Sequence, residues 1–195
     1  QIIRFMKLNI SDETIFYILA PANVDTGGPH DLHQLASELK ILGKNVYMYY
    51  YPKGEKNPVH ENYKLYNLPF TLEIEDDKKN VLIVPEINQT IILSKRFRHI
   101  QKVLWWLSLD YFFVSKFVET FPKFLRSIIK IPFNLICLFN KITLNNFGNL
   151  SLPKYLKTIY LGYPFKNNIY VENISINLSQ SKYQYHILKS KNIDS

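Results

Sequence analysis

Apolar residues gather in short runs between polar turns, and the first runs have the pattern of a buried strand followed by a helix. Thr14–Ala20 is apolar, aromatic and β-branched throughout, which predicts a parallel strand buried on both faces. A loop leads to Pro29, a residue suited to the first turn of a helix. Apolar residues then recur every three or four positions as far as Gly43, which predicts a helix with one apolar face and a glycine stop. Asn45–Tyr51 is the second predicted strand.

Later apolar runs repeat this alternation of strands and helices. The further predicted strands are Val81–Glu86, which Pro85 breaks, then Lys102–Ser108 and Asn173–Ser181, with room for one more short strand in Tyr63–Asn80. The further predicted helices are a short basic one at Thr90–Ile100 and a closing one at Ser181–Lys191. A strand, helix and strand in this order form a βαβ unit with a right-handed crossover. We therefore predict a single α/β domain over residues 1–195, Rossmann-like, with a mostly parallel sheet and flanking helices.

Tyr111–Ile142 departs from this alternation and is predicted to be a basic, aromatic-rich helical insertion. Clusters of Phe, Leu and Ile alternate there with Lys and Arg, and two prolines interrupt them. No uninterrupted apolar run approaches the roughly 20 residues that cross a bilayer. Two interpretations stay open: a cationic amphipathic helix on a membrane surface, or a pair of helices that cover a core and extend Lys and Arg into solvent.

Composition and charge narrow the classes of partner. The hydrophobic share of 47% excludes a disordered chain, and the net charge of +8 favours anionic partners such as phosphorylated ligands, nucleic acid or an acidic membrane surface. The basic residues are spread among bulky apolar ones without a known nucleic-acid-binding pattern, so we expect no nucleic-acid partner. The single cysteine, Cys137, forms no intramolecular disulfide, and the amino-terminal residues lack a signal-peptide pattern. We expect a cytoplasmic protein.

The carboxyl ends of parallel strands form the edge where α/β sheets bind ligands, and the first loop brings Gly27 and Gly28 to that edge. Two glycines before a helix let a ligand approach the backbone where the helix dipole favours negative charge. The alternative is that they only form a tight turn. His30 and Asp31 follow in the first helical turn and place a base and an acid beside them. The glycine motifs that bind NAD and ATP are absent.

Two later positions are predicted at the same edge. Glu86 closes a buried strand, where its carboxylate would bind a hydroxyl, act as a base or cap a helix. Trp105 and Trp106 face opposite sides of the sheet, so at least one belongs to the core, and Trp106 is the candidate for stacking on a sugar ring. Five scattered histidines without cysteine partners indicate no metal site.

Several of these segments resemble the amino-terminal domain of bacterial GT-B glycosyltransferases. The opening FYILAPANVDTGGPHDLHQLASELKILGKNVYMYYYP has their strand, GG turn and leucine-patterned helix, and VLIVPE, KVLWWLSLDYF and INLSQSKYQYHIL look like their later strands and loops. Together the segments cover most of the chain. The resemblance implies the acceptor-binding half of an enzyme that builds capsule or lipopolysaccharide glycans. The donor domain, which holds the nucleotide sugar, is expected to lie outside this sequence.

On this resemblance the partner of the chain is a glycan or lipid-linked acceptor, and the nucleotide sugar binds through the missing second domain. Gly27 and Gly28 would approach donor phosphate or acceptor across the cleft, with His30 and Asp31 bordering it. No catalytic base is assigned, and the resemblance implies neither a metal nor a cofactor. The basic insertion suits a peripheral enzyme on the inner face of the cytoplasmic membrane. The alternative is a non-catalytic Rossmann-like binding or scaffold module associated with a membrane or a partner protein.

Overall fold

The computed structural model describes residues 7–143 and 174–190, and the chain divides into two compact units. The first unit consists of Gln1–Leu107 and Val171–Ser195, and the second of Ser108–Tyr170. The first unit holds the predicted sheet, and most of the described part of the second falls in the segment predicted as a helical insertion.

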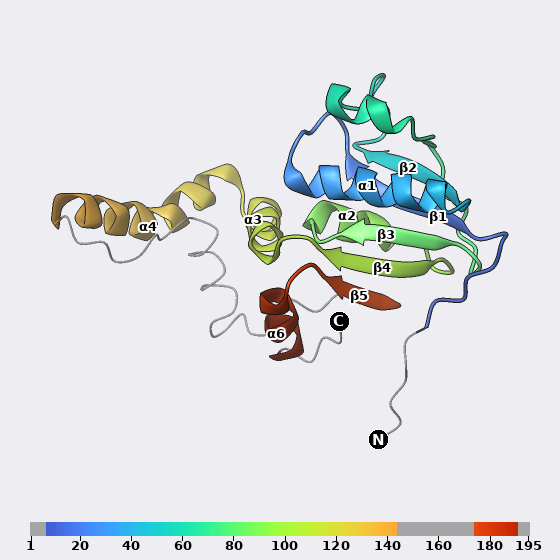
Figure 1. The fold of residues 1–195 in the computed structure, drawn as a ribbon. Helices are drawn as coiled ribbons and strands as arrows, with labels where there is room; N and C mark the ends of the chain where they lie inside the picture. Colours follow the sequence, from blue (N-terminus) through green and yellow to red (C-terminus); the bar gives the residue numbers. More distant parts are fainter. Residues whose placement is uncertain (1–6, 144–173, 191–195) are drawn as a thin grey trace. The chain divides into compact units, whose positions relative to one another are not determined.

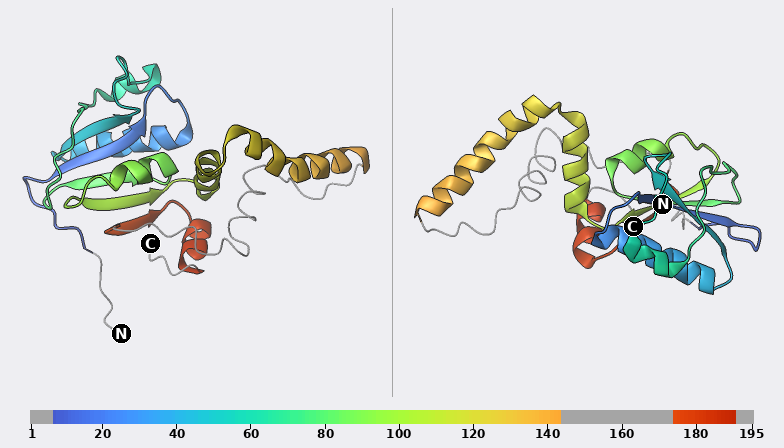
Figure 2. Two further views of the ribbon diagram at one scale, coloured as in Figure 1. Left: turned by 180° about the vertical axis from the view of Figure 1, so that it is seen from behind. Right: turned by 90° about the horizontal axis from the view of Figure 1, so that it is seen from above.

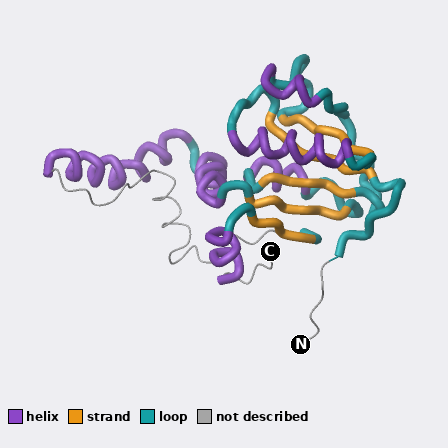
Figure 3. The backbone as a smooth tube through the Cα atoms, in the orientation of Figure 1, coloured by secondary structure: helices purple, strands orange, loops and turns teal. Residues whose placement is uncertain are grey.

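An all-parallel sheet, five-stranded within the described residues, forms the centre of the first unit (Figure 3). Its spatial order is β2-β1-β3-β4-β5, so the order reverses direction between β1 and β3. Such a reversal is the point at which open α/β sheets bind ligands, outside the carboxyl ends of the strands. The strands are β1 (Ile15–Pro21), β2 (Asn45–Tyr51), β3 (Val81–Pro85), β4 (Gln101–Trp106) and β5 (Ile176–Ser179).

Helices cover both faces of this sheet. Helix α1 (Gly27–Ile41) lies on one face and α2 (Asn88–Ser94) on the opposite face, as Figures 1 and 2 show, and α6 (Lys182–Ser190) follows β5. Alternate residues of each strand point to opposite faces, so both faces of β1 and β3 are apolar and buried. On the α1 side the core includes Leu32 and Ala36 of the helix itself. These layers confirm the predicted α/β Rossmann-like fold.

The segment between β2 and β3 differs from the prediction. Instead of a strand in Tyr63–Asn80 it contains a 3₁₀ helix, η1 (Glu61–Tyr66), and one isolated parallel bridge between Met48 and Phe70. The bridge lies at the outer edge of β2, where the order 3-2-1-4-5-6 of a Rossmann sheet has its third strand. The strand is reduced to this bridge because Pro69 has no N–H on one side of it, and on the other side the N–H of Glu73 donates to the Thr71 hydroxyl at 3.1 Å.

The helix predicted at Thr90–Ile100 is also shorter than expected, because a side chain competes for its backbone donors. The backbone N–H groups of Arg98, His99 and Ile100 donate to the carboxylate of Asp76, at 2.8, 2.9 and 2.9 Å. These bonds hold the three residues in a loop that leads into β4, and the helix ends at Ser94.

The described part of the second unit contains two helices, α3 (Leu109–Thr120) and α4 (Lys123–Thr143). Ser108 caps α3 by accepting from the backbone N–H of Tyr111. Pro122 separates the helices, whereas Pro132 lies inside α4. In the part of the chain that the structure describes, no helix has the length and apolar character that a bilayer crossing requires. The predicted bounds Asn173 and Lys191 lie outside the described residues.

Candidate functional site

Gly27 and Gly28 form the first residues of α1, at the carboxyl edge of the sheet. Neither glycine has a positive φ. A Cβ added at Gly27 would meet no atom within 4 Å, and one at Gly28 would lie 3.6 Å from Leu107 Cδ1, an ordinary van der Waals distance. The fold itself therefore has room for a side chain at both positions, and a tight turn does not explain the two glycines.

Replacing both glycines with alanine should leave folding intact and raise the free energy of unfolding by about 0.5 kcal/mol at each position, because alanine loses less backbone entropy in a helix. If a ligand approaches this backbone closely, the same G27A/G28A variant should bind it more weakly. Thermal denaturation and ligand titration of the variant separate the two effects. A large loss of stability would show that the glycines are structural.

His30 and Asp31 lie next to each other at this edge, as predicted. His30 Nδ1 is 3.7 Å from Asp31 Oδ1, and about half of the His30 side chain is exposed. The other ring nitrogen of His30 lies 3.2 Å from the Tyr66 hydroxyl of η1. The side-chain amide of Gln180, in the loop after β5, donates to Asp31 Oδ2 at 2.9 Å. A base and an acid of α1, a hydroxyl of η1 and an amide from the loop after β5 thus share one exposed rim.

Glu86 is at the predicted edge, but its side chain is directed into the protein. It is 3% exposed, and its Oε2 accepts the backbone N–H of Leu107 at 3.1 Å. The side-chain amide of Gln184 donates to the carbonyl of Leu107 at 3.0 Å, so both backbone groups of this residue are held. Glu86 therefore fixes the loop after β4, next to the glycine pair.

Trp106 is fully buried, and its indole N–H donates to Asn177 Oδ1 of the neighbouring strand at 3.0 Å. A ring with no exposed face cannot stack on a sugar in this conformation, so the structure places Trp106 in the core. Trp105, on the other side of the sheet, is partly buried against the α1-side core.

A group of side chains that the sequence did not indicate joins the loop after β1 to η1. The Tyr63 hydroxyl donates to Asp25 Oδ1 at 2.9 Å, and the Asn62 amide donates to the other oxygen of that carboxylate. The hydrogen bond from Tyr63 lowers the pKa of Asp25. Burial and the same carboxylate raise the pKa of Tyr63 to about 12. The carboxylate therefore holds η1 beside the first turn of α1.

His33 connects this group to the sheet. Its ring is 1% exposed and stacks on Tyr63, with centroids 4.1 Å apart and planes at 23°. Nδ1 lies 2.6 Å from the carbonyl of Pro29 and Nε2 lies 2.8 Å from the Tyr50 hydroxyl. A carbonyl only accepts, so Nδ1 carries the proton and Nε2 accepts from Tyr50. Burial lowers the pKa of His33, which favours this neutral ring.

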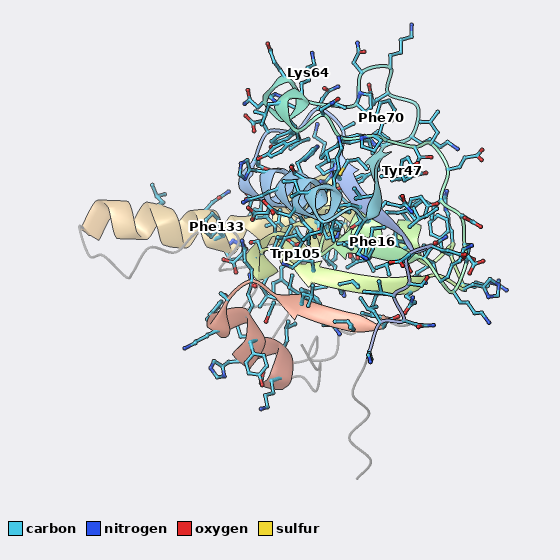
Figure 4. The ribbon with its side chains drawn as sticks, turned by 45° about the vertical axis from the view of Figure 1, so that its right-hand side comes forward. Phe16, Tyr47, Lys64, Phe70, Trp105 and Phe133 are labelled. Carbon is cyan, nitrogen blue, oxygen red and sulfur yellow. The ribbon has the colours of Figure 1, made fainter. Side chains whose placement is uncertain are left out.

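His33, Tyr50 and Tyr63 form one wall of a cavity of about 320 Å³ beside the carboxyl-terminal half of β2. Figure 4 shows Lys64 on η1 and Phe70 on the segment that follows it. The cavity combines aromatic faces with amide and ammonium groups, a combination that stacks on a sugar ring and binds hydroxyl or anionic substituents. Its lining comprises His33, Tyr50, Lys56, Asn57, Pro58, Val59, Tyr63, Lys64, Asn67, Leu68 and Phe70.

A larger cavity of about 590 Å³ lies at the opposite edge of the sheet, before β4 and β5. Its lining includes Lys95, Arg98 and Lys102, and burial lowers the pKa of Lys102. We take the smaller cavity as the candidate site, because α/β sheets bind their ligands at the carboxyl ends of the strands. Among the described residues, no three His, Cys, Asp or Glu side chains come together as a metal site.

Comparison of the chain with protein-family models, with curated proteins and with solved structures found no match.

Proposed function

We propose that the chain is the acceptor-binding half of a GT-B glycosyltransferase, which transfers a sugar from a nucleotide-sugar donor to a glycan or lipid-linked acceptor in surface polysaccharide synthesis. The observation that carries the proposal is the cavity beside β2, which has aromatic walls and polar groups at its rim. The Rossmann-like sheet and the resemblance of the segments around Gly27 and Gly28 support it. On this proposal the reaction takes place on the cytoplasmic side of the membrane, and a second domain holds the donor.

The lining of the cavity offers the groups that a glycan acceptor would contact. The Phe70 ring is 46% exposed and meets the Tyr50 ring edge to face, with centroids 6.0 Å apart, so it offers an apolar surface to a sugar. Lys56 and Lys64 supply positive charge for a phosphate or carboxylate on the acceptor. The neutral His33 and the Tyr50 hydroxyl line the wall, where the Tyr50 oxygen can accept a hydrogen bond from an acceptor hydroxyl.

The exposed rim at the first turn of α1 is the place where an acceptor would meet the donor. His30 belongs to α1, like His33 of the cavity wall, and its ring lies 6.4 Å from the Tyr63 ring, which also lines the cavity. The backbone N–H groups at the start of α1 favour a donor phosphate. The proposal assigns His30 and Asp31 to this border and assigns no catalytic base.

Replacing Phe70 with alanine should weaken acceptor binding about five- to tenfold, the loss of one aromatic contact of roughly 1 kcal/mol. A panel of oligosaccharides and nucleotide sugars, titrated calorimetrically into the chain, measures this change. Leu65→Ala is the matched control, because Leu65 is 76% exposed on η1 and lies outside the cavity lining. For acceptors with anionic groups, Lys56→Gln should also weaken binding, with Lys53→Gln as its control.

Three results would contradict the proposal. Nucleotide-sugar binding in this cavity, without acceptor binding, would make the chain a donor domain. If no glycan in the panel gave a binding signal, acceptor binding would be excluded and a scaffold role for the fold would be favoured. Equal losses in F70A and L65A would show that binding occurs away from the cavity.

A further inference from the structure

Helix α4 carries a stripe of exposed apolar side chains. Its members recur at steps of four and three residues, which places them on one side of a helix. Each is between 50% and 66% exposed, although a large apolar side chain is normally buried. The stripe consists of Phe124, Ile128, Ile131, Leu135 and Leu138.

The charges of α4 have a single sign. The helix contains four Lys and Arg residues and no Asp or Glu. At 100° per residue, Lys123, Arg126 and Lys130 fall on one flank, beside the apolar stripe. A helix with this division of residues gains free energy at an interface that is apolar below and negatively charged above.

These charges distinguish between two surfaces that could cover the apolar stripe, a second copy of α4 and an anionic bilayer. A second copy of α4 would bring its own Lys and Arg close to those of the first, and no acidic residue of the helix would compensate the repulsion. An anionic bilayer offers acyl chains to the stripe and negative headgroups to the flank. Its fluid surface also accepts the irregularity that Pro132 introduces into the helix.

We propose that α4 binds the surface of a bilayer that contains anionic lipids, with its axis in the plane of the membrane. The apolar stripe enters the boundary between headgroups and acyl chains, and the basic flank contacts lipid phosphates. The inference rests on α4 alone and is independent of the proposed glycan site. In an enzyme with a lipid-linked acceptor, such a helix would hold the chain at the membrane that contains the acceptor.

Flotation with vesicles tests this interaction in the full chain. Vesicles of phosphatidylcholine mixed with phosphatidylglycerol should bind the protein, and added salt should weaken the binding. The triple variant K123Q/R126Q/K130Q should bind at least about tenfold more weakly, since each basic residue near an anionic surface contributes to affinity. Glutamine retains good helix propensity, so this variant keeps α4 intact. The matched control, K53Q/K78Q/R96Q, removes the same charge from exposed positions of the first unit and should bind like the native chain.

A second variant tests the apolar half of the interface. I128S/L135S should also lose vesicle binding while all the basic residues remain. Equal binding of the native chain and K123Q/R126Q/K130Q, or equal binding to vesicles of phosphatidylcholine alone, would overturn the proposal. It would also fail if the native chain ignored vesicles and formed a dimer in sedimentation that I128S/L135S abolished, because the stripe would then bind a second copy.

Discussion

Replacement of Glu86 with alanine should lower the free energy of unfolding by about 3 kcal/mol. The substitution removes a buried carboxylate and the bond that it accepts from the backbone N–H of Leu107 at 3.1 Å, so that this N–H keeps only the carbonyl of Trp105, also at 3.1 Å. A hydrogen bond to a charged group contributes about 1.5–3 kcal/mol, and the space left by the side chain adds to that loss. Urea denaturation followed by circular dichroism measures the change.

Glu86→Gln is the matched control, because the amide oxygen still accepts from the N–H of Leu107 in a side chain of the same shape. It should cost about 1 kcal/mol or less. If E86A unfolded like the native protein, Glu86 would not hold the loop after β4. If E86A stayed stable but lost glycan binding, the carboxylate would act on the ligand, as the sequence pattern suggested.

The sheet was predictable because its strands are buried on both faces, which leaves short uninterrupted apolar runs in the sequence. Asn45–Tyr51 has the predicted bounds, β1 lies one residue later than predicted, and β3 ends one residue earlier. The errors occur where single hydrogen bonds decide the backbone. Asp76 takes the N–H donors that would have extended α2, and a carboxylate 22 residues from Arg98 leaves no periodic signal there.

The site was predictable only in part, because one half of it follows from position along the chain and the other half from contacts between distant segments. The rule that ligands bind at the carboxyl edge located His30 and Asp31, since both lie in the first turn of the helix that follows the first strand. The cavity depends on contacts between distant segments: His33 of α1 meets Tyr50, 17 residues away, and stacks on Tyr63. No motif marks such a cluster. The available signal was the tyrosines and amides between β2 and β3, a segment that we interpreted only as room for a short strand.

Trp106 shows the opposite error. A tryptophan at the end of a strand suits either a binding edge or the core, and the alternation of faces only requires that Trp105 and Trp106 point to opposite sides. Which of them is exposed depends on what covers each face, and sequence periodicity contains no information about that. The bond from the Trp106 indole to Asn177 of the neighbouring strand satisfies its only donor inside the protein, so it needs neither water nor ligand.

Acidification should destabilise the protein from about pH 6.5 downwards, and His33 should be the main cause. Burial lowers the pKa of His33 below its usual 6.5, so the folded protein binds this proton less readily than the unfolded chain. The stability that His33 contributes is present above pH 6.5 and is lost as the pH falls towards the folded pKa. The loss reaches about 1.4 kcal/mol per pH unit where only the unfolded chain is protonated.

The physical reason lies in the two bonds of the ring. A second proton on Nε2 would meet the Tyr50 hydroxyl, which now donates to that atom, and would place an uncompensated charge in a nearly fully buried position. Because His33 lines the cavity, acid should also weaken ligand binding there. Asp25 and Asp76 have pKa values lowered from 3.8, so their contribution is lost only at more acidic pH.

Urea denaturation of the native chain and of His33→Gln, repeated between about pH 7.5 and 4.5, isolates this contribution. Glutamine has no proton to gain, so H33Q should be less stable at neutral pH but should show a flatter dependence on pH across this window. His186→Gln is the control, because it removes an exposed histidine that does not line the cavity and leaves the His33 ring with both of its bonds. Parallel curves for H33Q and the native chain would mean that His33 takes up its proton without opening the fold, and the Nε2–Tyr50 bond would then have to rearrange to accept the charge.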